Sequence, residues 1–296
     1  MLSRSRQQHT PNIWPRVRGD GRVRLLILKF SEASFLLSCT SAQHLFKRVH
    51  LVPLSALALA GLVALSGANQ EWFYTINRLS VYAFPGFWAN WTVLGDALLV
   101  LALTLPWVGR RPGLVWKMFC AAVVTAVLIQ TGKIVFNVPR PPAVLPPESF
   151  FSVGPVLSSK AFPSGHTATA FMFAAVMSAC FPSRGLRIAL LIMAAGVGVS
   201  RIMVGVHWPL DVLVGAAVGW WGALAGMCLA GHWRFGMTRA GQQVLAALLV
   251  SATVYLLLLY DSRYPQAALL EFIVAGVALS LGLPGAARLW RHRVTR

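Results

Sequence analysis

The sequence predicts an all-α protein, a polytopic helical bundle that crosses a membrane several times. Three observations support this prediction: 57% of the 296 residues are hydrophobic, 11% are charged, and the mean hydropathy is +0.66. Ordinary water-soluble domains do not reach such values. The apolar residues also form runs long enough to cross a bilayer as helices, which takes about 18 or more residues.

Eight such runs are predicted to span the membrane: 51–68, 90–108, 114–133, 165–182, 186–204, 211–231, 241–260 and 266–285. The fifth is the weakest candidate, because Arg187 and Arg201 leave only thirteen uncharged residues between them. So many spans leave no room for a soluble domain. We expect a basic cytoplasmic tail over 1–50, a membrane core over 51–235, and a further transmembrane hairpin with a basic tail over 236–296.

The net charge of +18 is distributed as membrane topology requires. Nine of the 26 Lys and Arg residues lie within the first 48 residues. Eleven others lie at or near alternate connections between the runs or in the C-terminal tail: Arg110, Arg111, Lys117, Arg184, Arg187, Arg234, Arg239, Arg288, Arg291, Arg293 and Arg296. Lysine and arginine accumulate on the cytoplasmic side of membrane proteins and attract anionic lipid headgroups. We therefore expect cytoplasmic termini and no nucleic-acid partner. The outer connections are then 69–89, 134–164, 205–210 and 261–265.

The polar residues that topology leaves unexplained form three islands on the outer side. The first, KIVFNVPRPP, holds Lys133 and Arg140, and its prolines are expected to end the third span before Arg140. The second, AFPSGHTATA, places Ser164 before an apolar helix, where serine is a good N-cap and free N–H groups attract anions. The third, SRIMVGVHWPLD, puts Asp211 four residues after His207, so the carboxylate can reach one imidazole nitrogen.

Taken alone, each island has an ordinary structural explanation. Lys133 could extend to the interface at a helix end, and Arg201 could be an interfacial anchor. Ser164 and Gly165 could only cap a helix, and the histidine–aspartate pair could be structural. Together, however, three cations, two histidines, a carboxylate and a helix N-terminus on one membrane face indicate a binding site for a phosphate-like dianion.

The three islands resemble the signature of the type-2 phosphatidic acid phosphatase (PAP2) superfamily, which is K-x6-RP, PSGH and SR-x5-H-x3-D. All three parts are present without a gap: the first from Lys133 to Pro141, the second over 163–166, and the third from Ser200 to Asp211. The resemblance implies that residues 51–235 form a PAP2-like six-helix core. The last two predicted spans would then be an addition to that core.

The resemblance also implies a role for each residue. His207 would be the nucleophile that forms a phosphohistidine, Asp211 would orient it, and His166 would be the general acid. The phosphoryl oxygens would be held by Lys133, Arg140, Ser164, Gly165 and Arg201.

The chemistry agrees with these roles, because phosphoryl transfer depends mainly on positioning and on stabilising charge at the phosphoryl oxygens. Many enzymes use Mg²⁺ for this purpose. Here three cations and the N–H groups of a helix end could replace the metal, and the islands offer only Asp211 as a carboxylate ligand. We therefore expect no metal and no other cofactor.

The function expected from the resemblance is a lipid phosphatase of the bacterial inner (plasma) membrane, with its site facing the periplasm or exterior. Its substrate would be a lipid phosphomonoester or pyrophosphate, such as undecaprenyl pyrophosphate, lipid A, phosphatidylglycerophosphate or phosphatidate. A phosphotransferase that passes the phosphate from His207 to an acceptor lipid is the main alternative. A non-enzymatic lipid transporter or scaffold is a third. The sequence makes no prediction of oligomeric state.

The last two predicted spans are joined by YDSRYPQ, and their polar residues Asp261, Arg263 and Glu271 would lie near the same outer face. These residues could shape substrate access. We expect instead that the two spans pack against the core and the lipid.

Overall fold

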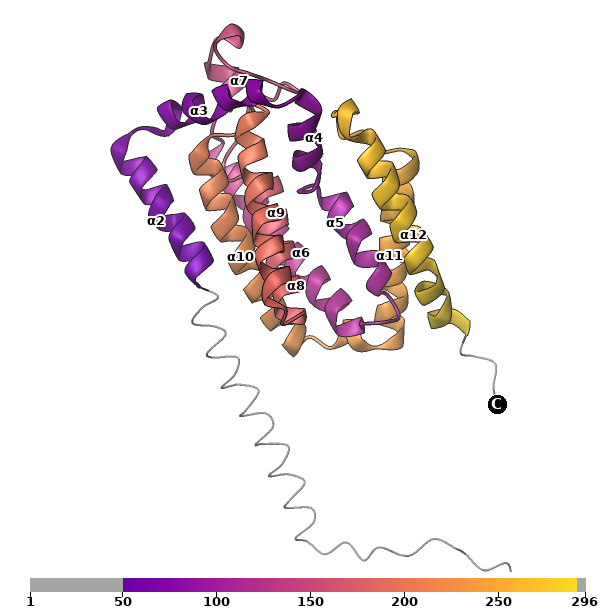
Figure 1. Ribbon diagram of the computed structural model, residues 1–296. Helices are drawn as coiled ribbons and strands as arrows, with labels where there is room; N and C mark the ends of the chain where they lie inside the picture. Colours follow the sequence, from indigo (N-terminus) through magenta and orange to yellow (C-terminus); the bar gives the residue numbers. More distant parts are fainter. Residues whose placement is uncertain (1–49, 292–296) are drawn as a thin grey trace, which may run out of the picture. The chain divides into compact units, whose positions relative to one another are not determined.

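The computed structural model describes residues 50–291, and every regular element within them is a helix (Figure 1). The predicted basic tail over 1–50 lies almost entirely outside the described residues. The prediction of an all-α polytopic membrane bundle is confirmed. The α-helices are α2 (Leu51–Ser66), α3 (Asn69–Asn77), α4 (Pro85–Val93), α5 (Ala97–Thr104), α6 (Pro112–Phe136), α7 (Pro141–Val144), α8 (Gly165–Cys180), α9 (Arg184–Met203), α10 (Pro209–His232), α11 (Arg239–Leu258) and α12 (Ala268–Arg291).

Each predicted membrane run corresponds to helical structure, but not every run is one straight helix. Within the described residues, five segments are long and apolar enough to cross a membrane, and they contain α6, α9, α10, α11 and α12. Helix α8 is also apolar, but its 16 residues make it shorter than the other candidate spans. Helices α4 and α5 share one predicted run and are bent by 61° at their break, while α2 and α3 meet at 111°.

Helix α10 packs against α6, α8 and α2. Small residues allow this close packing, as is common between membrane helices. A Cβ atom on Gly215 would lie 2.7 Å from the carbonyl oxygen of Ser164, so only glycine lets the start of α8 approach α10 at this point. This contact matters because it joins the second and third polar islands.

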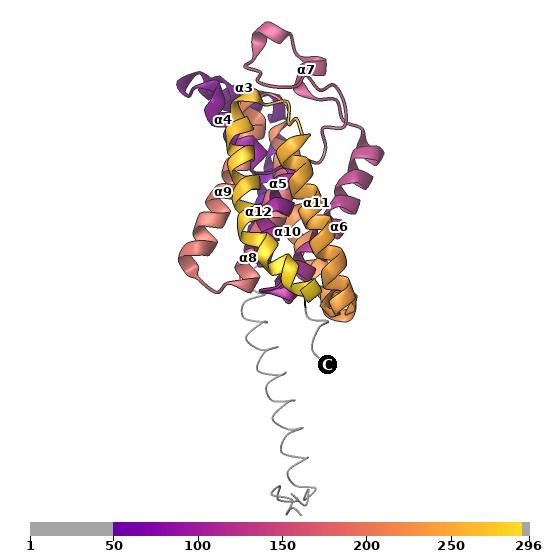
Figure 2. The same ribbon diagram turned by 90° about the vertical axis from the view of Figure 1, so that its right-hand side faces the viewer.

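The C-terminal hairpin, α11 and α12, packs on α5, as Figures 1 and 2 show. Leu99 and Ala102 of α5 form a buried apolar cluster with Leu256, Ala275 and Ala278 of the hairpin. The hairpin thus covers the short helix that follows the break in the second span. The apolar faces of the hairpin thus pack against the core, as expected. The connection between its two helices also contacts residues of the candidate site.

The cations of the three polar islands and the arginines between α5 and α6 lie at opposite ends of the bundle. Helices α3 and α7 lie at one end of the bundle, whereas α2 begins and α12 ends towards the other (Figure 1). At that second end, Arg110 donates to the carbonyl of Leu281 at 2.7 Å, and the Arg111 guanidinium lies 4.6 Å from the ring centre of Phe181. The three polar islands lie at the first end.

Candidate functional site

The first island begins where α6 ends. The helix stops at Phe136, as its following prolines predict, and Asn137 adopts a left-handed conformation with its N–H bonded to the carbonyl of Lys133. Lys133 therefore lies in the last turn of α6. The chain then continues in an extended conformation to Arg140, which precedes the short helix α7.

Arg140 is held by the backbone of two other connections and is 6% exposed. Its Nε donates to the carbonyl of Ser159 at 2.9 Å and its Nη2 to that of Lys160 at 3.3 Å. Its Nη1 donates to the carbonyl of Val206 at 3.1 Å and lies 3.2 Å from Nε2 of His207. The guanidinium thus joins the first island to the third.

The second island opens α8, with Ser164 at the N-cap position as predicted, although the structure gives its side chain no capping hydrogen bond. The backbone N–H of Ser164 donates to the carbonyl of Asp211 at 3.0 Å. Its hydroxyl accepts from Thr167 at 2.9 Å, which leaves the Ser164 proton for another acceptor. A Cβ atom on Gly165 would lie 3.5 Å from Nζ of Lys133. The N-terminus of α8 is therefore next to a cation, as an anion site requires.

The third island places His207 and Asp211 at the start of α10, whose first residue is Pro209. Both side chains are 2% exposed, and Nδ1 of His207 lies 3.2 Å from Oδ2 of Asp211, so the expected contact is present. The same oxygen accepts from the backbone N–H of Trp208 at 2.9 Å. These contacts indicate the tautomer. The Asp211 carboxylate accepts from Nδ1–H, and the lone pair of Nε2 faces the Arg140 guanidinium, which can only donate.

Burial and the neighbouring cations favour the neutral form of His207. Burial first, and then the positive charges of Arg140, Arg201 and Lys133, lower the pKa of His207 well below its ordinary value of 6.5. His166 adds a smaller effect in the same direction. The unprotonated imidazole is therefore favoured at neutral pH, with the electron pair of Nε2 accepting from Arg140.

Arg201 turns into the bundle rather than towards lipid, which explains how the short fifth run can be a spanning helix. It is 3% exposed. Its Nη1 donates to the hydroxyl of Thr92 at 3.3 Å and to that of Tyr264 at 3.2 Å. Its Nε is buried without a hydrogen-bond partner, so it remains available to an anion. Neither Thr92 nor Tyr264 belongs to the three predicted islands.

His166 has a carboxylate neighbour that sequence reasoning missed. Its Nε2 lies 4.0 Å from Oδ2 of Asp96, at the break between α4 and α5. The same oxygen accepts a hydrogen bond of 2.6 Å from the hydroxyl of Tyr260, in the connection of the C-terminal hairpin. One signal could have identified Asp96: it is one of only eight acidic residues and lies inside a predicted span, where ionisable groups are usually functional.

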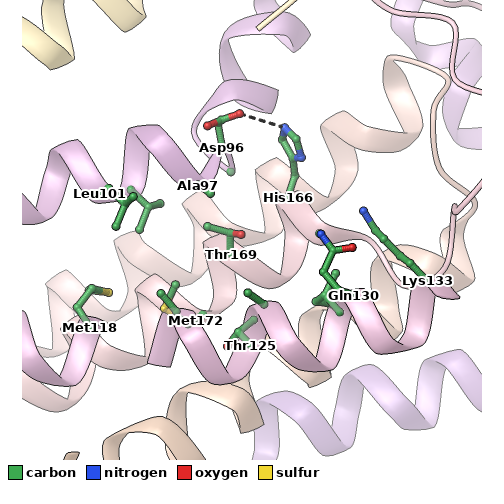
Figure 3. Close-up of a pocket in the computed structure, with 16 residues that line it drawn as sticks. Asp96, Ala97, Leu101, Met118, Thr125, Gln130, Lys133, His166, Thr169 and Met172 are labelled. Atoms are coloured by element: carbon green, nitrogen blue, oxygen red, sulfur yellow. Dashed lines mark ion pairs between the residues drawn. The ribbon is translucent and has the colours of Figure 1, made fainter. Parts of the chain in front are cut away.

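A cavity of about 330 Å³ extends from these residues between α5, α6 and α8. Figure 3 shows Asp96, His166 and Lys133 at one end of it, and Leu101 and Met118 towards the other. Lys133 and Met118 are fifteen residues apart on α6, which corresponds to about 22 Å of helix. Ala97 on α5 and Ala126 on α6 line the cavity and are exposed, so it opens sideways between these helices.

The site offers an anion mainly N–H donors and cations. Among residues 50–291, no three His, Cys, Asp or Glu side chains lie close enough to share a metal ion. The expectation that no metal is needed stays a prediction. Fold and site together define a multi-pass membrane protein with a cluster of buried cations, histidines and N–H donors at one end of its helices.

Comparison with known proteins agrees with this class. The model of the PAP2 superfamily matches residues 114–235, a segment that contains all three islands. A lipid A 1-phosphatase of Rhizobium etli is 42% identical over 65 residues, and phosphatidylglycerophosphatase B of Escherichia coli K12 is 44% identical over 63 residues. These segments cover 22% and 20% of this chain, and 27% and 25% of the two relatives.

Among solved structures, the crystal structure of Aquifex aeolicus LpxE is 32% identical in sequence. The match covers 54% of this chain and 94% of that one, with a TM-score of 0.48. A membrane PAP2-type phosphatidylglycerolphosphate phosphatase from Bacillus subtilis matches at 20% identity over 62% of this chain and 98% of that one, with a TM-score of 0.45. Residues 114–235, which hold all three islands, are thus similar to the PAP2 superfamily.

Proposed function

We propose that this protein is a membrane lipid phosphatase that hydrolyses a lipid phosphomonoester or pyrophosphate through a phosphohistidine at His207. One observation carries the proposal. The neutral imidazole of His207 is held between the Asp211 carboxylate at 3.2 Å and the Arg140 guanidinium at 3.2 Å, with its free electron pair facing the cations. This arrangement suits a nucleophile whose target is an anionic phosphorus centre.

In the first step, Nε2 of His207 attacks phosphorus and the bond from phosphorus to the lipid oxygen breaks. His166 gives its proton to the departing oxygen, which leaves as an alcohol or a phosphate. Arg140, Arg201 and Lys133 stabilise the charge on the phosphoryl oxygens, with help from the Ser164 hydroxyl and the backbone N–H of Gly165. Asp211 stabilises the positive charge that His207 acquires.

In the second step, a water molecule attacks phosphorus and gives a proton to His166. The bond from phosphorus to Nε2 breaks, which restores neutral His207 and releases inorganic phosphate. His166 has then regained the proton that it lost in the first step. The same groups thus act in both halves of the reaction.

The cavity supports a lipid as the substrate. His166, the proposed general acid, and Lys133 line one end of the cavity. The rest of its wall is mainly apolar and extends about 22 Å along α6. The hydrocarbon core of a bilayer is about 30 Å thick, so one alkyl or prenyl chain could lie along this wall while its phosphate reaches His207. The names of the relatives, lipid A 1-phosphatase and phosphatidylglycerophosphatase B, agree with such a substrate.

Phosphate release from a substrate panel tests the function. Purified protein in detergent with EDTA is given lipid A, phosphatidylglycerophosphate, phosphatidate and undecaprenyl pyrophosphate, with His207→Ala as the blank. We expect release from at least one lipid at a rate that Mg²⁺ does not raise. Release that appears only when an acceptor lipid is added would identify a transferase instead. No release from any lipid, or release only with Mg²⁺, would contradict the proposal.

Blocking the cavity should discriminate between long and short substrates. Tryptophan at Ala126 would fill the apolar wall without touching the phosphate groups, so KM for a long-chain lipid phosphate is expected to rise about tenfold or more. Turnover of water-soluble p-nitrophenyl phosphate should stay unchanged. Val127→Trp is the matched control, because Val127 is the next residue of α6, is 59% exposed and does not line the cavity. Equal effects of the two substitutions on KM would argue against this cavity as the lipid site.

The lowered pKa of His207 predicts how its reactivity depends on pH. In a His166→Ala background, the burst of nitrophenolate from p-nitrophenyl phosphate reports the attack by His207 alone. Because the pKa lies well below 6.5, the imidazole stays unprotonated, and the burst rate should not fall as the pH drops from about 7.5 to 6.5. A histidine with its ordinary pKa would lose about half of its reactive form at pH 6.5, so a half-maximal rate there would refute this prediction.

The charge distribution predicts that the site faces the periplasm or exterior of a bacterial inner membrane. Cysteine at Glu148 should react with a membrane-impermeant maleimide in intact cells, whereas cysteine at Arg234 should react only after the cells are opened. Both variants are made in a background without the native cysteines. The two positions are exposed and lie at opposite ends of the bundle. The reverse labelling pattern would overturn the orientation.

A further inference from the structure

The break between α4 and α5 lies directly against the start of α8. A Cβ atom on Gly95 would lie 2.7 Å from the carbonyl oxygen of His166 and 2.6 Å from Val197, so a larger residue does not fit there. The next residue, Asp96, caps α5 by accepting from the N–H of Leu98 at 2.8 Å. The glycine therefore allows the carboxylate to reach the histidine.

The two oxygens of Asp96 have separate tasks. Oδ1 makes the cap, while Oδ2 lies 4.0 Å from Nε2 of His166 (Figure 3). Oδ2 also accepts the hydrogen bond of 2.6 Å from Tyr260. Burial and this hydrogen bond raise the pKa of Tyr260, so its hydroxyl remains a donor. The carboxylate is thus held from the hairpin side with one oxygen directed towards the imidazole.

His166 needs such a partner because its other neighbours oppose its protonation. Burial first, and then the positive charges of Arg201, Lys133 and Arg140, disfavour a charge on this imidazole. A general acid must nevertheless carry a proton when the substrate is bound. A carboxylate near Nε2 favours the protonated ring, and it directs Nε2–H towards itself. The proton on Nδ1, at the opposite side of the ring, is then the one available to the leaving oxygen.

We propose that Asp96, held by Tyr260 of the C-terminal hairpin, is the positioning residue of His166, so that the hairpin is part of the catalytic apparatus. This inference rests on the proposed phosphatase function. A second contact points the same way, since Tyr264 of the same connection accepts a hydrogen bond from Arg201 at 3.2 Å. The connection between α11 and α12 therefore supports two of the side chains that would surround the phosphate.

The test compares a poor and a good leaving group in the same variants. Asp96→Asn keeps an oxygen that can cap α5 but removes the negative charge. It is expected to slow phosphate release from the lipid phosphate about 100-fold, within the range of a lost general acid. The first burst of nitrophenolate from p-nitrophenyl phosphate should change less than about threefold, because this leaving group needs little acid assistance. Tyr260→Phe should show the same selectivity with a loss of roughly five- to tenfold.

Two further variants complete the design. Tyr255→Phe is the matched control, because this tyrosine lies on α11 next to Tyr260 and is 47% exposed. We expect this variant to react with both substrates at the wild-type rate. Adding Asp96→Asn to His166→Ala should cause no further loss, since the carboxylate acts through the imidazole.

The outcomes separate this inference from the proposed function. Equal losses of Asp96→Asn with both substrates, or additive losses in the double variant, would overturn the positioning role while the wild-type activity stands. So would an Asp96→Asn variant with normal lipid turnover. A wild-type protein that releases phosphate from no lipid would overturn the proposed function and, with it, this inference.

Discussion

Replacing His207 by alanine is expected to abolish phosphoenzyme formation with every substrate, whatever the leaving group. Without the imidazole no Nε2 can attack phosphorus, and the cations and helix N-terminus alone only bind the phosphate. The loss in kcat should be of the order of 10⁶-fold, as when other enzymes lose a nucleophile. Vanadate, which resembles the five-coordinate phosphoryl group, should bind the wild-type site through the same cations.

The informative comparison is with His166→Ala. This variant keeps the nucleophile, so p-nitrophenyl phosphate should still give a burst of nitrophenolate equal to the amount of enzyme. The phosphoenzyme should then accumulate, because no base activates the attacking water. Turnover of a lipid phosphate should fall about 10²–10⁴-fold, because an alkoxide is a much poorer leaving group and needs the acid.

Asp211→Asn provides the third member of this series. It preserves the shape of the side chain next to Nδ1 but removes the charge that stabilises the developing imidazolium. Its loss of activity should therefore fall between those of His207→Ala and His166→Ala. A burst that survives in His207→Ala and disappears in His166→Ala would show that the two histidines have the opposite roles. A radiolabelled phosphoenzyme, trapped with acid-free denaturant, distinguishes these results directly.

The parts of the site that are continuous in sequence could be predicted, because their geometry is local. Asp211 lies one helical turn after His207, and a proline at the start of the helix fixes the direction of that turn. The end of α6 and the start of α8 follow in the same way from prolines and from a serine before an apolar helix. Short-range stereochemistry therefore accounts for Lys133 in the last turn of α6, for Ser164 at the start of α8, and for Asp211 in the first turn of α10.

The contacts made by Asp96, Tyr260 and Tyr264 could not be predicted, because they join segments far apart in the sequence. Asp96 and Tyr260 are 164 residues apart, and their contact depends on a break in the second span that its apolar composition conceals. The same limit applies to the hairpin. Its apolar faces indicated packing, but only the structure shows that the connection between them reaches Arg201 and the neighbour of His166.

The fold differed from the prediction where local chemistry interrupts an apolar run. The run over 90–108 is apolar enough for one span, yet Gly95 and the capping oxygen of Asp96 start a new helix inside it. The charge at Arg201 made the next-to-last core run look short. In the structure Nη1 of this side chain donates to two hydroxyl groups inside the bundle, so the arginine faces neighbouring helices and its charge is no obstacle to a spanning helix.

Arg140→Ala is expected to lower both activity and stability, because this side chain links phosphate binding to the architecture of the site. The arginine would hold a phosphoryl oxygen beside the nucleophile, and its loss should lower kcat/KM about 10³-fold. It also leaves the carbonyls of Ser159, Lys160 and Val206 without their donor. The carbonyl of Val206 is buried, and leaving it without a donor costs about 1–3 kcal/mol, so the melting temperature should fall as well.

Arg140→Lys separates these two consequences. Lysine keeps the positive charge, but a single ammonium group cannot satisfy three carbonyls and a phosphoryl oxygen in the planar geometry of a guanidinium. We therefore expect it to recover little of the lost kcat/KM. Free guanidinium ion at millimolar concentration should restore part of the activity of Arg140→Ala, since it can occupy the same position, and it should not affect Arg140→Lys. Arg78→Ala, at an exposed arginine on the same end of the bundle, is the control for loss of charge alone. Full activity of Arg140→Lys would mean that the site needs only a positive charge there, and the argument from guanidinium geometry would then be wrong.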